Sequence, residues 1–181
     1  MSIQGWNILI AGGSGLIGRH LSAQLARHGA RVRILTRHPE LKKNLTGVEY
    51  IGWDGKTTAG WGQWISETQA VINLAGESLS HWPWSQKRLQ LIRDSRLFSG
   101  GALVEAIGNA NQKPRVFVQA SAIGYYGNTG DAIIDESTPP GKDVLANIVT
   151  AWEASTRKVE DFQVRRPVIR TGLVLDAHEG V

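Results

Sequence analysis

The sequence predicts an α/β fold in which a doubly wound parallel sheet lies between two layers of helices, a three-layer αβα arrangement. Two observations carry this prediction. Short apolar runs alternate with helical patterns along most of the chain, and a glycine-rich turn joins the first apolar run to the first helical pattern. A sheet of this type has the strand order 3-2-1-4-5-6, with its ligands at the carboxyl ends of the strands.

Six segments rich in β-branched and other apolar residues are the predicted strands: 8–11, 31–36, 48–53, 70–75, 115–121 and 164–170. Helical patterns cover 16–28, 85–109 and 143–162. The second of these is expected to be interrupted near Gly100 and Gly101, because each glycine costs a helix roughly 1 kcal/mol relative to alanine. Residues 127–142 form the longest predicted loop, and loops of this length often cover a substrate.

Composition limits the class of protein. The chain has 181 residues, a net charge of +4 and no cysteine, so we expect one domain over residues 1–181 without disulfides or thiol chemistry. Lysine and arginine are scattered and no apolar run could span a bilayer, so we expect a cytoplasmic protein that binds neither nucleic acid nor membrane. The five histidines, His81 among them, show no metal-ligand spacing, and we predict no metal.

The most informative segment is residues 8–18, with the sequence ILIAGGSGLIG. Glycines allow a tight turn and a close approach of the backbone to a ligand, and the free N–H groups of the following helix favour a pyrophosphate. The predicted cofactor contacts in this segment are Gly12, Gly13, Ser14, Gly15, Leu16, Ile17 and Gly18. An ordinary βα turn remains the alternative.

The end of the second predicted strand favours NADP over NAD as the cofactor. Enzymes that use NAD usually place an acidic residue there to bind the ribose 2′-hydroxyl. This chain has Thr36 and Arg37 instead, and no acid before Glu40. A guanidinium and a hydroxyl would bind a 2′-phosphate. Alternatively, Arg37 is only a surface arginine at a strand end.

Other strand ends complete the predicted site. Leu74, Ala75 and Gly76 lie at the end of the fourth strand, and small residues at that edge would let the cofactor approach. Asp54, after the third strand, is also assigned to the cofactor site. Ser121 ends the fifth strand, and its hydroxyl could reach a substrate oxygen near the nicotinamide, or it could bond local backbone.

The remaining candidates for catalysis are Glu153 and a tyrosine. Glu153 could act as a base if it faces the nicotinamide, or it could form a plain surface pair with Arg157 four residues on. Tyr125 or Tyr126 could act as an acid from the loop after the fifth strand. The alternative for both is aromatic packing against the cofactor or the sheet.

Two further pairs are candidates for substrate contacts. Arg93 and Arg96, three residues apart on a helix, could grip an acidic substrate or form a solvated face. Trp82 and Trp84 follow the fourth strand and could wall a substrate site or form a hydrophobic plug.

Together, these segments resemble the short-chain dehydrogenase/reductase superfamily in its extended, sugar-nucleotide-epimerase-like branch. They are most similar to an atypical, cell-division-inhibitor-like subfamily. The phrases that carry the resemblance are 71–78 (VINLAGES), 120–127 (ASAIGYYG), 135–141 (DESTPPG), 152–153 (WE) and 170–175 (RTGLVL). The resemblance implies an NADP-binding Rossmann domain, with the phosphate loop at Gly12, Gly15 and Gly18. It also places the 2′-phosphate contact at Arg37 and the catalytic-type serine at Ser121.

The sequence departs from this superfamily in two ways. The Tyr-x-x-x-Lys pair that supplies its acid and base is absent from the whole chain, and relatives continue well past the segment that ends this one. Two functions therefore stay open: an oxidoreductase or epimerase for a small or nucleotide-linked substrate, and a catalytically silent NADP-binding module. Because positioning can contribute ~7–11 kcal/mol of a reaction barrier, we expect this chain to bind cofactor and to turn over little.

Overall fold

The computed structural model describes residues 2–41, 45–79 and 83–176. Its centre is a sheet of six strands in the order β3-β2-β1-β4-β5-β6. The strands are β1 (Asn7–Ala11), β2 (Arg31–Thr36), β3 (Val48–Gly52), β4 (Ala70–Asn73), β5 (Val116–Ala122) and β6 (Val168–Thr171). All five neighbouring pairs are parallel. The predicted doubly wound sheet and its strand order are confirmed.

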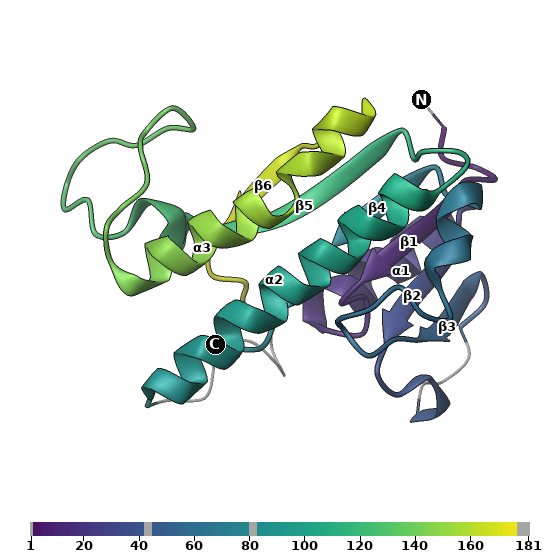
Figure 1. The fold of residues 1–181 in the computed structure, drawn as a ribbon, viewed down its shortest axis with the longest axis horizontal. Coiled ribbons are helices and arrows are strands. Elements are labelled where there is room, and N and C mark those ends of the chain that lie inside the picture. Colours follow the sequence, from purple (N-terminus) through teal and green to yellow (C-terminus); the bar gives the residue numbers. More distant parts are fainter. Residues whose placement is uncertain (1, 42–44, 80–82, 177–181) are drawn as a thin grey trace.

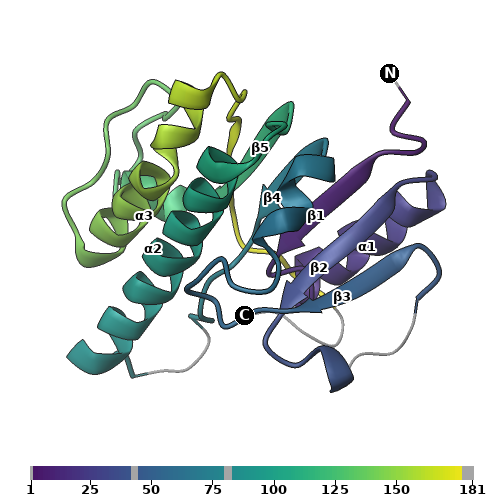
Figure 2. The ribbon, with the colours of Figure 1, turned by 45° about the vertical axis from the view of Figure 1, so that its right-hand side comes forward.

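Helices cover both faces of this sheet. α1 (Leu16–Arg27) lies on one face, and α2 (Gln86–Asn109) and α3 (Val144–Ser155) lie side by side on the other (Figures 1 and 2). Alternation along β1 explains the division, because successive strand residues point to opposite faces. Ile8 and Ile10 belong to the core cluster that contacts α1, whereas Leu9 and Ala11 belong to the cluster beneath α2. None of the described helices is both long and apolar enough to cross a membrane.

Three strands are shorter than the sequence predicts, although β3 lacks only residue 53. β4 ends at Asn73 rather than residue 75, because the Asn73 side chain accepts a hydrogen bond from the backbone N–H of Ala75 (3.2 Å) and turns the chain. β6 begins at Val168 rather than residue 164. Pro167 has no N–H to donate to a strand ladder, and the regular pairing starts after it.

The helix predicted over 143–162 is also shorter. It starts after Asp143, whose carboxylate accepts a hydrogen bond from the N–H of Ala146 (2.8 Å), and ends at Ser155. Thr156 has φ −112° and ψ 2°, and its buried hydroxyl donates to Gln119 of β5 (3.0 Å). A short 3-10 helix (Arg157–Phe162) follows. The apolar periodicity continues through this break, so the sequence pattern could not locate it.

The connection between β3 and β4 holds no α-helix. A 3-10 helix (Gly62–Glu67) and two tryptophans fill the space instead. The rings of Trp53 and Trp61 meet edge to face at 5.5 Å, and both indole N–H groups donate to the carbonyl of Thr57 (2.8 Å each). Both side chains are buried in the core cluster that α2 also contacts. The two tryptophans of this connection therefore fill the space in the core that a crossover helix would otherwise occupy.

The predicted loop over 127–142 contains no helix or strand and projects beyond the sheet beside the start of α3 (Figure 1). It is shaped locally by Asp135. This carboxylate accepts hydrogen bonds from the N–H and hydroxyl of Ser137, which hold the pKa of Asp135 below its ordinary value. Near it, the side chain of Ile133 is fully exposed.

The expected interruption of the second helix at Gly100 and Gly101 is wrong, because α2 runs unbroken from Gln86 to Asn109. The two glycines have different surroundings. A Cβ on Gly100 would overlap Ser155 of α3 and would approach the Thr156 methyl group within 3.1 Å, whereas a Cβ on Gly101 would meet nothing. Gly100 therefore permits the close packing of α2 on α3, and this packing supports a helix that glycine alone weakens.

We predict opposite effects from alanine at these two neighbouring positions. Gly101→Ala should raise the free energy of unfolding by about 0.5–1 kcal/mol, because it improves helix propensity at an exposed position. Gly100→Ala should lower it by about 1–3 kcal/mol through overpacking against α3. Urea unfolding followed by circular dichroism measures both, and a stabilised Gly100→Ala variant would contradict the packing role.

Candidate cofactor and substrate site

Two glycines of the turn after β1 could not be replaced by another residue without movement of the backbone. Gly12 has φ +76°, and a Cβ there would lie 2.6 Å from the carbonyl oxygen of Leu74. A Cβ on Gly18 would come within 2.5 Å of the Cα of Gly13. The turn therefore packs tightly against the end of β4 and against α1, while Gly15 and Ile17 remain exposed on its outer side.

The first turn of α1 leaves its N–H groups without a side-chain cap. Gly15 is the N-cap residue, makes no side-chain hydrogen bond, and is followed by no acidic residue in the first turn. The two other described α-helices are capped, α2 by Ser85 and α3 by Asp143. An uncapped helix N-terminus at a glycine turn has donors and a positive dipole end for a phosphate.

The ends of β2 and β3 place Thr36, Arg37 and Asp54 at the same edge of the sheet. Thr36 is buried, and its hydroxyl accepts a long hydrogen bond from the N–H of His38 (3.4 Å). The Arg37 side chain is exposed and makes no hydrogen bond or ion pair within the described segments. Asp54 is occupied locally: hydrogen bonds from Thr57 and Lys56 hold its pKa below its ordinary value. Glu40, the first acid after the strand, lies beside His38 (3.4 Å).

Residues 74–76 lie directly beside the glycine turn. The N–H of Leu74 donates to the carbonyl of Ala11 (2.9 Å), which continues the β1–β4 pairing past Asn73. Leu74 and Ala75 are half-buried and Gly76 is exposed. The structure thus brings together the two predicted cofactor segments, 12–18 and 74–76, at the point where the strand order reverses, which is where ligands bind in sheets of this type.

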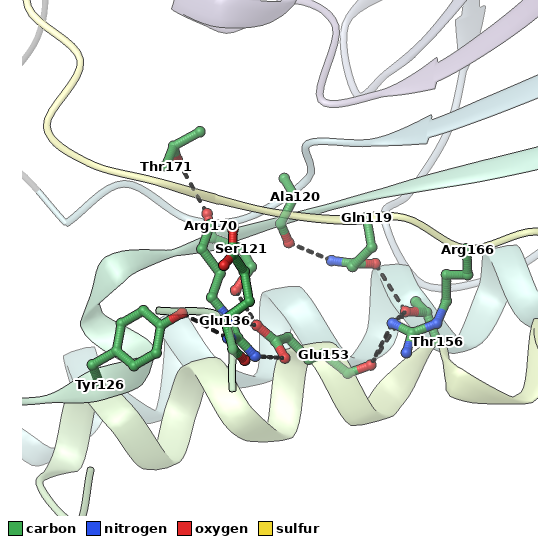
Figure 3. Close-up of polar contacts among 10 residues, drawn as sticks. All are labelled: Gln119, Ala120, Ser121, Tyr126, Glu136, Glu153, Thr156, Arg166, Arg170 and Thr171. Atoms are coloured by element: carbon green, nitrogen blue, oxygen red, sulfur yellow. Dashed lines mark hydrogen bonds and ion pairs between the residues drawn. The ribbon is translucent and has the colours of Figure 1, made fainter. Parts of the chain in front are cut away.

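Ser121 and Glu153 form one buried polar cluster with Arg170 (Figure 3). The Ser121 hydroxyl donates to Glu153 Oε1 (2.5 Å). Arg170, the register partner of Ser121 on β6, donates to the same carboxylate from Nε (2.9 Å) and Nη2 (3.1 Å). Hydrogen bonds from Arg170 to Glu153 raise the pKa of Arg170 above its ordinary value. The alternative of a surface pair between Glu153 and Arg157 is therefore wrong.

The two tyrosines after β5 pack around the same arginine. The Arg170 guanidinium stacks on the Tyr125 ring, 3.5 Å from its centroid, and Nη1 donates to the hydroxyl of Tyr126 (2.8 Å). Nη1 also lies 3.4 Å from the carbonyl of Glu136, in the loop over 127–142. Arg170 thus connects β6 to the two tyrosines after β5 and to the loop over 127–142. Tyr126 is buried and Tyr125 is half-buried.

Sequence reasoning missed the role of Arg170. An arginine within an otherwise apolar strand pattern was the available signal, and its position one strand away from Ser121 could be inferred only with the strand order known. It also missed residues 174–176, which lie against α1 across a depression of about 450 Å³. There, Asp176 is 3.8 Å from His20.

Some of the residues considered for contacts with a substrate or a metal lie among the described residues, and others do not. Arg93 is half-exposed, and within the described residues its one polar partner is its neighbour Asp94 (3.3 Å), as expected for a solvated residue, whereas Arg96 is largely buried. The Trp84 indole donates to the carbonyl of Leu79 (3.0 Å). His81 and Trp82 lie outside the described residues. No group of three or more potential metal ligands occurs among the residues described.

We predict that Glu153 contributes strongly to stability. Its side chain is 13% exposed and that of Arg170 18%, so Glu153→Ala leaves a buried cation unpaired and should lower the free energy of unfolding by about 3–5 kcal/mol. Glu49→Ala is the control, because Glu49 is 58% exposed in its pair with Arg33 and should contribute less than about 1 kcal/mol. Equal losses in urea unfolding would contradict a buried ion pair.

Comparison with known proteins places this geometry in a family. Residues 8–154 match the NAD dependent epimerase/dehydratase family. An epimerase family protein of Mycobacterium leprae is 35% identical over 175 residues, which cover 96% of this chain and 54% of that protein. The chain spans about half the length of the curated relatives it matches.

Two solved structures extend the likeness to the fold. The human epimerase family protein SDR39U1, crystallised with NADPH, superposes with a TM-score of 0.77 at 29% identity, covering 97% of this chain and 56% of that one. A nucleoside-diphosphate sugar epimerase of Corynebacterium glutamicum gives 0.79 at 30% identity, covering 98% and 36%. The chain belongs to the NAD dependent epimerase/dehydratase family, as an atypical, epimerase-like member of the extended short-chain dehydrogenase/reductases.

Proposed function

We propose that this chain binds NADP(H) at the carboxyl ends of β1, β2 and β4. It would do so as the cofactor-binding part of an epimerase- or reductase-like protein that acts on a small or nucleotide-linked substrate. The observation that carries the proposal is the uncapped N-terminus of α1 behind the glycine turn. It offers a pyrophosphate several unpaired N–H donors at the topological switch point of the sheet.

The preference for NADP rests on Arg37. This guanidinium is exposed at the end of β2 and makes no hydrogen bond or ion pair with the described residues. A carboxylate at the same position would select NAD. A 2′-phosphate would give it a charge-assisted contact. The human relative, which was solved with NADPH, supports the same choice.

A bound nicotinamide would supply hydride transfer. The residues of this chain would then hold and orient the substrate, and Ser121 is the candidate at the end of β5. Its proton is already donated to Glu153, so its oxygen is left to accept a hydrogen bond, as a substrate hydroxyl would offer. Glu153 is itself held by Arg170, which makes it a fixed anion that orients Ser121 rather than a free base.

A catalytically silent NADP-binding module is the second candidate function. The observation that favours it is the absence of Tyr-x-x-x-Lys from the sequence, together with the internal pairing of Ser121 and Glu153. NADPH binding without oxidation of NADPH by any aldehyde, ketone or sugar nucleotide tested would support this second function.

We predict tighter binding of NADPH than of NADH, measured by fluorescence titration of the reduced cofactors. Arg37→Ala should weaken NADPH binding by roughly tenfold or more and leave NADH binding unchanged, because only NADPH carries the 2′-phosphate.

Arg31→Ala is the matched control. Arg31 is exposed at the opposite end of the same strand, so its loss changes the net charge equally without touching the proposed site. Equal affinities for the two cofactors in the unaltered chain, or equal effects of the two substitutions, would contradict the assignment of Arg37.

A further inference from the structure

Arg96 of α2 is a largely buried cation that no carboxylate neutralises directly. Its Nη1 donates to two backbone carbonyls, those of Glu77 (3.0 Å) and Ile92 (2.9 Å). Within the described part of the chain, its Nε and Nη2 donate to nothing. The carboxylate of Glu77 is instead paired with Arg88 (3.0 Å). Burial lowers the pKa of Arg96 to about 10, against the opposing effect of Glu77, so the guanidinium remains charged at neutral pH.

The surroundings fix this guanidinium at the ligand edge of the sheet. A Cβ on Gly76 would lie 2.9 Å from the Arg96 Cζ, so the chain after β4 passes directly against this guanidinium. On α3, the Trp152 ring centroid is 4.9 Å from the same carbon. Gly76 belongs to the segment that continues from Leu74 beside the glycine turn, so Arg96 lies just behind predicted cofactor contacts.

A second group beside Arg96 also lacks an acceptor. The indole Nε1–H of Trp152 is buried and donates to nothing in the described residues, although the side chain is only 6% exposed. Buried N–H groups are rarely left unpaired, because each costs about 1–3 kcal/mol. The Nε and Nη2 atoms of Arg96 are not fully buried, so a ligand in solvent can reach them. An accessible guanidinium in contact with a buried, unpaired indole N–H is an arrangement that a site for an anionic oxygen would retain.

We propose that Arg96 and Trp152 form an anion-binding subsite behind Gly76, in which Nε–H and Nη2–H of Arg96 and Nε1–H of Trp152 donate to phosphate or carboxylate oxygens. The subsite rests on the proposed function in one respect: the anion would belong either to the NADPH pyrophosphate or to a substrate held beside the cofactor. The planar guanidinium suits both, because it can donate two parallel hydrogen bonds.

Nuclear magnetic resonance of the ¹⁵N-labelled chain tests the subsite directly. Trp152→Phe identifies the Trp152 indole signal. The signals of Trp152 Nε1–H and Arg96 Nε–H should shift on titration with NADPH or, at saturating NADPH, with inorganic phosphate. Adenosine 2′-monophosphate carries the 2′-phosphate but neither phosphate of the pyrophosphate bridge, and it separates the sources. If NADPH shifts the two signals and the monophosphate does not, the anion is the pyrophosphate; if phosphate shifts them in the NADPH complex, it is a substrate group.

Affinity measurements complete the test. Arg96→Met should weaken binding of the probe that shifts the signals by roughly tenfold to a hundredfold, whereas Arg93→Met, three residues earlier and half-exposed, should not. Arg96→Lys should recover only part of the lost affinity, because lysine restores the positive charge but not the two parallel N–H donors of a guanidinium. Three results would overturn the subsite: unshifted signals, equal effects of the two methionine variants, or a lower melting temperature for Arg96→Met with unchanged affinity.

Different measurements decide the anion-binding subsite and the cofactor proposal. A chain that binds no NADPH would overturn the cofactor proposal, and phosphate titration of the free chain would then decide the subsite by the same two signals.

Discussion

The side-chain amide of Gln119 holds together the half of the molecule that carries Ser121 and Glu153. It is fully buried, and its Oε1 accepts hydrogen bonds from Asn73 of β4 and from Thr156 at the end of α3 (3.0 Å each). Asn73 in turn accepts from the N–H of Ala75 and so shapes the predicted cofactor segment after β4. One buried amide therefore sets both the turn after β4 and the position where α3 ends, and buried networks of this kind are stable only when fully paired.

Two partly buried arginines, Arg170 and Arg96, differ in how their charge is compensated. Arg170 donates to both oxygens of Glu153, which in turn fixes the Ser121 hydroxyl, so every member of that cluster is satisfied internally. Among the described residues, Arg96 donates only to carbonyls, through Nη1, and its Nε and Nη2 make no hydrogen bond. A satisfied ion pair chiefly organises the protein itself, whereas unsatisfied donors favour recognition of something else. This contrast is the reason for proposing a positioning role for the Arg170 cluster and a ligand-binding role for Arg96.

The sequence was informative where the structure depends on local patterns. Strand order and the position of the glycine turn follow from apolar runs and from glycines close together in the chain, as at Gly12 and Gly18. It was uninformative where contacts join distant segments. The partner of Glu153 lies 17 residues on, in β6, and is reached only because α3 packs over β5. Gly100 looks like a helix breaker until α3 is seen against it, and Thr156 ends α3 through a bond to β5.

The position of α3, which contacts α2 on one side and the sheet on the other, governs both clusters at once. Trp152 and Glu153 are consecutive residues of α3, and successive helical side chains point about 100° apart. One therefore contacts Arg96 of α2 while the other contacts Ser121 and Arg170 at the sheet. Gly100 lets α2 approach α3 one turn beyond Arg96. A wider separation of α3 from α2 would withdraw Trp152 from Arg96, and a shift of α3 over the sheet would move Glu153 away from Ser121. The helix pair therefore couples the groups proposed to bind an anion to the serine proposed to orient a substrate.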